Sequence, residues 1–128
     1  MENIRCFVGV KALIENGNGR FLVMSPKGTK FRRKGSVFYD LPGGRINEGE
    51  QVEDTLRREV SEELGIGGNE LIILDIFDVS VSKIRMSARN VPLLLVTFEC
   101  GLTNYNQKFV LSREHSLCKW VPAQEAAK

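Results

Sequence analysis

The stretch QVEDTLRREVSEELG, residues 51–65, predicts one helix and decides the fold of this chain. Its apolar residues recur every four positions, at Val52, Leu56, Val60 and Leu64. Residues spaced in this way share one face of an α-helix, and such a face packs on a protein core. Gly65 follows them, and glycine is common at the position that ends a helix. We therefore predict an amphipathic helix over residues 51–64.

The same helix carries glutamates that a purely structural helix would not need. With Glu59 set at zero and about 100° added per residue, the apolar residues cover an arc from roughly 20° to 140°. Glu63 falls inside this arc, Glu59 lies at its edge, and Glu62 lies about 60° beyond that edge. A partly buried carboxylate costs several kcal/mol unless it is compensated. Two interpretations remain: a solvated acidic face helped by Arg57 and Arg58, or a site that binds a cation.

A cation site also accounts for the charge pattern before the helix. Residues 48–63 contain seven acids and two arginines, a net charge of −5, whereas residues 27–34 carry five cations and no acid. Mg²⁺ and Mn²⁺ prefer carboxylate oxygens as ligands. An acidic site beside a basic loop suits a polyphosphate that is bound together with its metal ion. The alternative interpretation of residues 27–34 is a solvated insertion.

The remaining segments predict a mixed α/β arrangement. Strands at 6–14 and 21–24 are joined by NGNG, residues 16–19, which favours a tight turn, so we predict a hairpin. Further strands are predicted at 37–41, 71–81, 92–100, 109–111 and 119–121, and a helix-like stretch begins at 122. This order favours an α/β or α+β class with a mixed sheet, in a single domain over residues 1–128.

The composition excludes several classes of protein. The chain has 128 residues, a formal charge of +2 and 42% hydrophobic residues, which is typical of a globular domain and not of a disordered one. The near-neutral charge gives no general case for binding nucleic acid or membranes, and the longest apolar run, 91–98, is too short to span a bilayer. Three cysteines without a CxxC pair, and one histidine, argue against a disulfide framework or zinc site. We expect a soluble, cytoplasmic protein.

The residues around the helix resemble the Nudix box. Gly44, Glu50 and the run REVSEELGI, residues 58–66, meet every fixed position of its pattern, G-x5-E-x7-R-E-U-x-E-E-x-G-U, where U is apolar. The preceding YDLPG, residues 39–43, is similar to the family's usual lead-in. The resemblance implies an α/β/α sandwich with a central mixed β-sheet, in which the box (44–66) forms a loop-helix-loop motif. It also implies hydrolysis of a nucleoside diphosphate linked to another group, with Mg²⁺ or Mn²⁺ as cofactor.

The resemblance implies a set of metal ligands. Glu59, Glu62 and Glu63 match the metal-binding glutamates of the family, and Gly43 matches a residue whose carbonyl is a frequent ligand. Near the C-terminus, SREH followed by a tryptophan is similar to a pattern that many members carry. Glu114 in that pattern is a candidate fourth ligand or general base, and the alternative is a surface acid. Which of these four glutamates accepts the proton stays open.

Other residues are expected to position the helix or bind substrate. By the same resemblance, Glu50 and Arg58 match residues that orient the catalytic helix and its glutamates, a role suited to a cation paired with carboxylates. We expect Lys27, Arg32 and Arg45 to bind the substrate. Trp120 is either a core residue or a base-stacking residue, as large aromatic side chains serve both purposes.

The substrate class follows by elimination. Family signatures of ADP-ribose and diadenosine polyphosphate hydrolases place a proline or tyrosine about where residues 81–83 have VSK. The resemblance then favours the MutT-like group, which splits nucleoside triphosphates into monophosphate and pyrophosphate. The alternatives are an ADP-ribose or dinucleoside polyphosphate hydrolase, an RNA 5′ pyrophosphohydrolase, or a nucleotide-binding module without activity. We expect a monomer or homodimer, with a C-terminal helix over 122–128 that is short or truncated.

Overall fold

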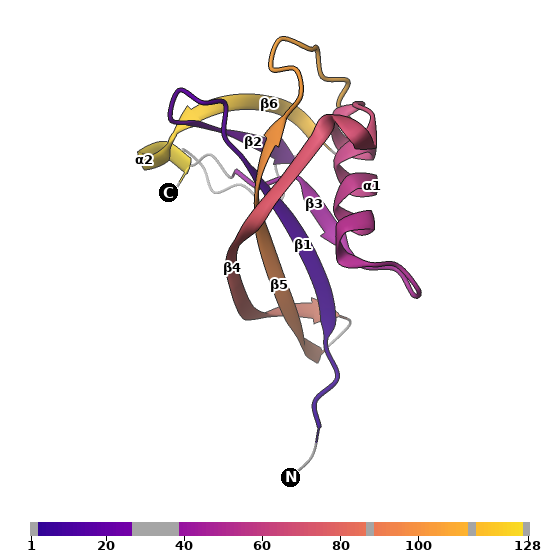
Figure 1. The fold of residues 1–128 in the computed structure, drawn as a ribbon. Helices are drawn as coiled ribbons and strands as arrows, with labels where there is room; N and C mark the ends of the chain where they lie inside the picture. The colour runs from indigo at the N-terminus through magenta and orange to yellow at the C-terminus, as the bar shows by residue number, and fades with distance from the viewer. Residues whose placement is uncertain (1–2, 27–38, 87–88, 113–114, 127–128) are drawn as a thin grey trace.

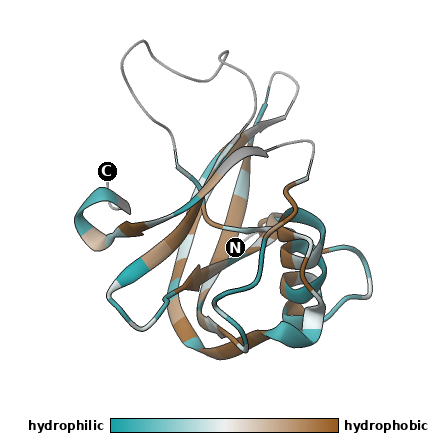
Figure 2. Ribbon diagram, turned by 90° about the horizontal axis from the view of Figure 1, so that it is seen from above, coloured by the Kyte–Doolittle hydropathy of each residue, from teal (hydrophilic) through white to brown (hydrophobic). Residues whose placement is uncertain are grey.

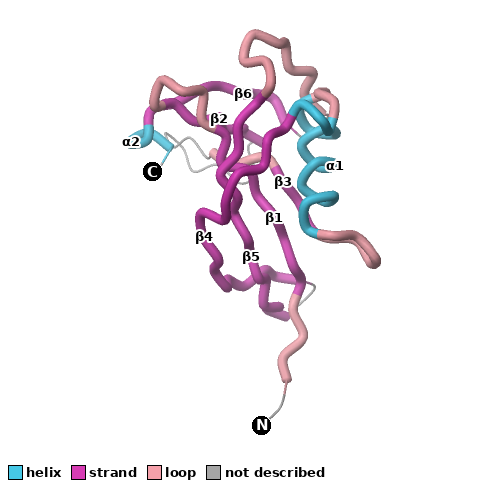
Figure 3. Tube along the Cα trace, viewed as in Figure 1, coloured by secondary structure: helices cyan, strands magenta, loops and turns pink. Residues whose placement is uncertain are grey.

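The computed structural model describes residues 3–26, 39–86, 89–112 and 115–126 of the chain. Figures 1 and 3 show the helix α1 on one side of the strands, next to β3 and β1. In chain order the elements are β1 (Phe7–Ile14), β2 (Arg20–Pro26), β3 (Gly43–Arg45), α1 (Val52–Leu64), η1 (Gly68–Glu70), β4 (Leu71–Met86), β5 (Arg89–Leu102), β6 (His115–Pro122) and α2 (Ala123–Ala126). The helix predicted over residues 51–64 is confirmed to within one residue.

The strands of the described segments form two sheets. The larger sheet has the order β3-β1-β5-β4, in which β1 and β5 are parallel and the other neighbouring pairs are antiparallel. The smaller sheet is the antiparallel pair of β2 and β6. In Figure 1 α1 lies along β1 and β3, so the helix with the glutamates stands next to the strand that contains Gly43 and Gly44. The predicted α/β class with a mixed sheet is confirmed.

The predicted hairpin between residues 6–14 and 21–24 is wrong, although its turn forms. Gly17 and Gly19 have φ values of 84° and 75°, a region that glycine adopts readily. The chain reverses there, with one bridge between Glu15 and Phe21. Beyond that bridge the strands separate, because β5 pairs with one edge of β1 and β3 with the other. With both edges of β1 occupied, β2 pairs with β6 instead.

Two of the shorter predicted strands are also corrected. Residues 109–111 are not a strand; Val110 N–H donates to the Leu64 carbonyl (2.7 Å), so the segment satisfies a carbonyl at the end of α1 that lacks a partner within the helix. Of residues 37–41, the first two lie outside the described residues, and Asp40 forms an isolated bridge with Met24. The strands predicted at 71–81 and 92–100 are confirmed and are longer, forming the pair of β4 and β5.

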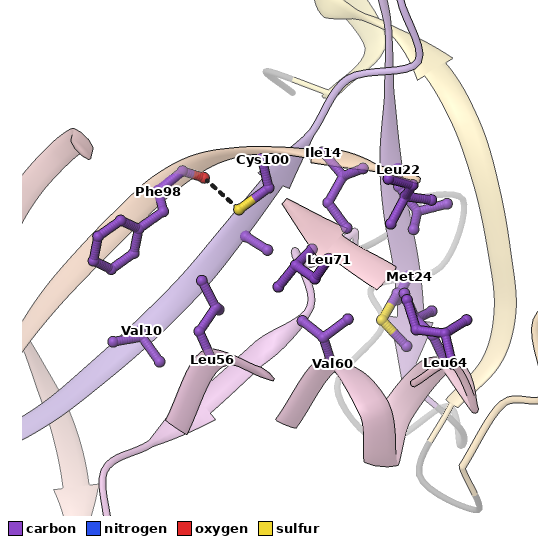
Figure 4. Close-up of a cluster of buried hydrophobic side chains, with 13 residues drawn as sticks. Val10, Ile14, Leu22, Met24, Leu56, Val60, Leu64, Leu71, Phe98 and Cys100 are labelled. Carbon is purple, nitrogen blue, oxygen red and sulfur yellow. Dashed lines mark hydrogen bonds between the residues drawn. The ribbon is translucent and has the colours of Figure 1, made fainter. Parts of the chain in front are cut away.

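The core lies between α1 and the strands, as Figure 4 shows. From α1 it takes Leu56, Val60 and Leu64, which are at most 1% exposed, so the predicted apolar face is confirmed. Val10, Ala12 and Ile14 of β1 and Leu22 and Met24 of β2 are fully buried beside them. Figure 2 shows hydrophobic residues along the strands and hydrophilic residues on much of α1. Truncation of a fully buried leucine such as Leu56 to alanine costs about 2 to 5 kcal/mol of stability. Burial of this face therefore holds α1 firmly on the sheet.

The end of α1 follows the sequence prediction. Gly65 has a φ of 70°, in the left-handed region, and its N–H donates to the Ser61 carbonyl (2.9 Å). A side chain at this position would also approach Val110 within 2.7 Å, so glycine is required there by both conformation and space. None of the helices in the described part of the chain is long and apolar enough to cross a bilayer.

Candidate active site

Two glycines of β3 allow close packing, Gly43 against β1 and Gly44 against α1. Gly43 has a φ of 151°, and a Cβ atom there would lie 2.0 Å from the Val10 carbonyl oxygen. At Gly44 a Cβ atom would lie 2.3 Å from Cδ of Glu59. Real Cβ atoms do not approach other atoms this closely, so the Glu59 carboxylate occupies the space that a side chain at residue 44 would need. The backbone of β3 is thereby brought against the glutamates of α1.

Glu63 is the buried member of the glutamate group. Its exposed fraction is 7%, as its position inside the apolar arc predicted. The N–H of Gly43 donates to its Oε1 (2.8 Å), which links α1 directly to β3. Burial raises the pKa of Glu63 to about 7, although the hydrogen bond from Gly43 and the positive charge of Lys11 both act to lower it. Near neutral pH this carboxyl is therefore balanced between its neutral and charged forms.

Arg58 joins Glu59 and Glu62 of the helix to Glu50, which lies just before it. Its guanidinium binds Glu50 through two hydrogen bonds, from Nε to Oε2 (2.8 Å) and from Nη2 to Oε1 (3.0 Å). Nη1 donates to Glu59 (2.9 Å) and lies 3.4 Å from both oxygens of Glu62. These carboxylates raise the pKa of Arg58 further above its ordinary value. One planar cation thus holds carboxylates from three positions in a fixed arrangement.

Glu50 is held from several sides at once. Its Oε1 accepts hydrogen bonds from the N–H of Asn47 (2.8 Å) and from the hydroxyl of Thr55 (3.0 Å), in addition to Arg58. The hydrogen bond from Arg58 is the main reason that the pKa of Glu50 is lowered to about 2, and the Asn47 N–H adds to it. Because its oxygens are engaged in these contacts, Glu50 is suited to orient Arg58.

The remaining glutamates have the chemistry to hold a divalent cation. Glu59 and Glu62 have side-chain exposures of 20% and 58%, and carboxylate oxygens are the ligands that Mg²⁺ and Mn²⁺ prefer. Within the described ranges no three acidic, histidine or cysteine side chains are already clustered tightly enough to hold an ion. The carboxylates of Glu59 and Glu62 are instead directed toward the guanidinium of Arg58. A cation that bound Glu59 and Glu62 would have to compete with Arg58 for them.

The structure places some of the predicted substrate residues. Arg45 ends β3 and stacks its guanidinium 4.8 Å from the ring centre of Phe7. With Lys11 and Gly44 it lines a groove of about 290 Å³, which also contacts three aliphatic side chains of β4 and β5: Ile84, Leu93 and Leu95. The other predicted residues, Lys27, Arg32 and Glu114, lie outside the described residues. The groove therefore combines an apolar floor with two cations, beside the glutamates of the box.

An ion pair near the site was not predicted from the sequence, which also left the role of Trp120 open. Lys11 and Asp40 form an ion pair (2.9 Å) close to Glu63, and the only signal for it was a lysine within the apolar strand FVGVKALI. Trp120 packs on the core cluster and stands 6.1 Å from the ring of Tyr105, in a tilted arrangement. The packing favours the core interpretation of Trp120.

Comparison with known proteins finds a family model, curated relatives and solved structures that match this chain. The NUDIX domain model matches residues 7–128. The bis(5′-nucleosyl)-tetraphosphatase [asymmetrical] of Mus musculus is 30% identical over 87 residues, which cover 68% of this chain and 57% of that protein. The nucleoside triphosphatase NudI of Escherichia fergusonii is 30% identical over 95 residues, covering 69% of this chain and 64% of that protein. The chain thus spans less than two thirds of the length of these curated relatives.

Solved structures share the fold. The MutT protein from Methanosarcina mazei Go1 superposes with a TM-score of 0.70 at 26% identity, covering 98% of this chain and 83% of that chain. A C. elegans Ap4A hydrolase in a binary complex superposes with a TM-score of 0.70 at 20% identity, covering 94% and 82%. The second likeness is evidence for the fold alone. With the match to the family model over nearly its whole length and the Nudix fold of its neighbours, this chain belongs to the Nudix family.

Proposed function

We propose that this chain is a divalent-metal-dependent hydrolase that cleaves a phosphoanhydride bond in a nucleotide. The observation that carries the proposal is the buried Glu63 carboxylate, held by the Gly43 N–H on the same helical face as Glu59 and Glu62. A carboxyl that is only 7% exposed and raised in pKa is costly to keep charged in a structural helix. A bound cation removes that cost.

Glu59, Glu62 and Glu63 would hold Mg²⁺ or Mn²⁺, with the Gly43 carbonyl and Glu114 as the further proposed ligands. When bound, such an ion lowers the pKa of a coordinated water and neutralises charge on phosphate oxygens. The residues of the chain supply the orientation: Glu50 fixes Arg58, and Arg58 fixes Glu59. A glutamate of this group accepts the proton of the attacking water. Lys27, Arg32 and Arg45 are the proposed contacts to outer phosphate oxygens.

The proposed substrate is a nucleoside triphosphate, which is split into a monophosphate and pyrophosphate. The groove beside Gly44 supports this, because Arg45 offers positive charge to phosphates and the aliphatic side chains of β4 and β5 offer a surface for a base or sugar. A relative that is 30% identical is a nucleoside triphosphatase. A second candidate is a dinucleoside polyphosphate, which is favoured by the relatives that are bis(5′-nucleosyl)-tetraphosphatases.

The test is a panel of nucleoside triphosphates, dinucleoside polyphosphates, ADP-ribose and RNA with a 5′ triphosphate, each incubated with Mg²⁺ or Mn²⁺ and resolved by chromatography. We expect cleavage of a triphosphate to monophosphate and pyrophosphate, which a chelator abolishes. Glu62→Gln should abolish it too, whereas the matched control Glu53→Gln, an exposed acid on the first turn of α1, should not. Preferred cleavage of a dinucleoside polyphosphate would select the second candidate. No cleavage of any compound would overturn the hydrolase proposal.

A further inference from the structure

Lys11 is the one charged residue of β1, whose sequence is FVGVKALI. Its neighbours Val10 and Ala12 are fully buried, and its own side chain is only 20% exposed. A lysine in this position loses part of its hydration and needs hydrogen-bond partners in return. Among the described residues, the recorded hydrogen-bond partners of its side chain belong to the segment 40–43, which ends in the first residue of β3.

The contacts of Lys11 fix the beginning of this segment. Its Nζ donates to Oδ2 of Asp40 (2.9 Å) and to the carbonyl oxygen of Leu41 (3.2 Å). The second carboxylate oxygen of Asp40, Oδ1, accepts the N–H of Leu41 (2.8 Å). Asp40 is also bound to Met24 of β2 through both of its backbone groups, each at 2.8 Å. Lys11 therefore acts on a piece of backbone that already has a defined path.

The end of the same segment holds the catalytic helix. The Pro42 carbonyl accepts the N–H of Ala12 (2.8 Å), and the next residue, Gly43, donates its N–H to Glu63 (2.8 Å). Lys11 and Gly43 are direct partners in the antiparallel register of β1 and β3. The side chain of Lys11 and the amide that holds Glu63 are thus joined by a segment of four residues that is bound to β1 at both ends.

We propose that Lys11, through its ion pair with Asp40, is a positioning residue that aims the Gly43 amide at the Glu63 carboxylate. It acts by fixing the backbone of residues 40–43, and it does not need to touch the substrate. Partners of this kind, which orient a ligand without being one, typically change metal affinity or activity between about 10- and 100-fold when they are removed. The effect on catalysis rests on the proposed function, whereas the effect on the Gly43 amide does not.

The first measurement is the rate of hydrogen exchange at the Gly43 amide, monitored by NMR in the metal-free protein without substrate. Lys11→Met should raise the exchange rate of the Gly43 amide by at least about 10-fold, because residues 40–43 then open more readily, and Lys11→Arg, which keeps a cation for Asp40, should restore most of the protection. Lys83→Met is the matched control, since Lys83 is an exposed lysine of strand β4. Unchanged exchange at Gly43 in folded Lys11→Met would overturn the proposal, whether or not any nucleotide is hydrolysed.

The second measurement is a double-mutant comparison of Mn²⁺ affinity and steady-state kinetics. Lys11→Met and Asp40→Asn should each weaken Mn²⁺ binding and lower kcat between about 10- and 100-fold while KM changes less than about twofold. The double variant should be no worse than either single variant, because both changes break the same pair. Multiplicative losses, or a rise in KM with kcat unchanged, would contradict the proposal; the latter would make Lys11 a substrate-binding residue. Asp40→Asn leaves Lys11 in place, so it serves if Lys11→Met does not fold.

Discussion

Replacing Glu63 by glutamine should make the metal-free protein more stable at pH 8, although it removes a proposed ligand. The pKa of Glu63 is about 7 in the folded chain, against 4.5 for an ordinary glutamate. This difference corresponds to roughly 2 to 3 kcal/mol, at 1.36 kcal/mol per pH unit and with some allowance for solvent screening. Glutamine has nearly the same shape, carries no charge, and can still accept the Gly43 N–H through its side-chain oxygen.

The pH dependence gives this prediction its sign. Between pH 4.5 and about 7 the folded protein holds a proton on Glu63 that the unfolded chain has lost. The free energy of unfolding of the wild type therefore falls as the pH rises through this window, and above pH 7 the full cost of the buried charge is present. Glu63→Gln has no such group. The free energy of unfolding of Glu63→Gln should exceed that of the wild type by roughly 2 to 3 kcal/mol at pH 8 and by less than about 1 kcal/mol at pH 4.5.

Urea unfolding in the presence of a chelator, at pH 4.5 and pH 8, measures this difference. Mg²⁺ added at pH 8 should then stabilise the wild type and leave Glu63→Gln unchanged, because an ion that binds only the folded state raises its stability. Glu53→Gln, on an exposed position of the same helix, should behave like the wild type: it should gain no stability at pH 8 and should still be stabilised by Mg²⁺. If Glu63→Gln were equally or less stable than the wild type at pH 8, the buried charge would not carry the cost on which the metal site was inferred.

Three further results are expected. Glu62→Gln should lower kcat at least about 100-fold, roughly 2.7 kcal/mol of transition-state stabilisation, with unchanged thermal unfolding; near-normal turnover would rule out its proposed role. Gly44→Ala should weaken Mn²⁺ binding and activity together, because the added Cβ would lie 2.3 Å from Cδ of Glu59 and displace that side chain; unchanged affinity in a calorimetric titration would contradict the close contact. Glu50 has a pKa lowered to about 2, chiefly by Arg58, so its contribution to stability is complete above pH 4.5 and is lost as the pH falls toward 2. The stability of Glu50→Gln should therefore fall less than that of the wild type between pH 4.5 and about pH 2. Identical curves of stability against pH for the two proteins would argue against this role of Glu50.

Features that depend on local sequence were predictable. The period of the apolar residues and Gly65 predicted α1 to within one residue, and the same helical geometry predicted that Glu63 is buried. The match to the Nudix box predicted the family, which the comparison over residues 7–128 confirms. In each case the information lies within about twenty neighbouring residues, where backbone geometry alone fixes which side chains share a face.

Features that depend on distant segments were not predictable from one sequence. The turn at 16–19 predicted that β1 and β2 form a hairpin. Instead, β3 and β5, which come later in the chain, occupy the two edges of β1. The segment 109–111 is β-rich in composition, yet the Val110 N–H donates to the Leu64 carbonyl at the end of α1. The importance of Lys11 appears only with Asp40, 29 residues later, because an ion pair has no sequence signature when its members are so far apart.

The guanidinium at position 58 has a consequence for how an ion would enter and leave. It acts as a built-in counterion, so the acidic face of α1 is kept from repelling itself before any metal arrives. Binding of an ion would then be an exchange of one positive partner for another, and its net affinity would be lower than that of a bare group of acids. For the proposed hydrolase, the same exchange would ease release of the ion, with Arg58 pairing again with Glu59 and Glu62.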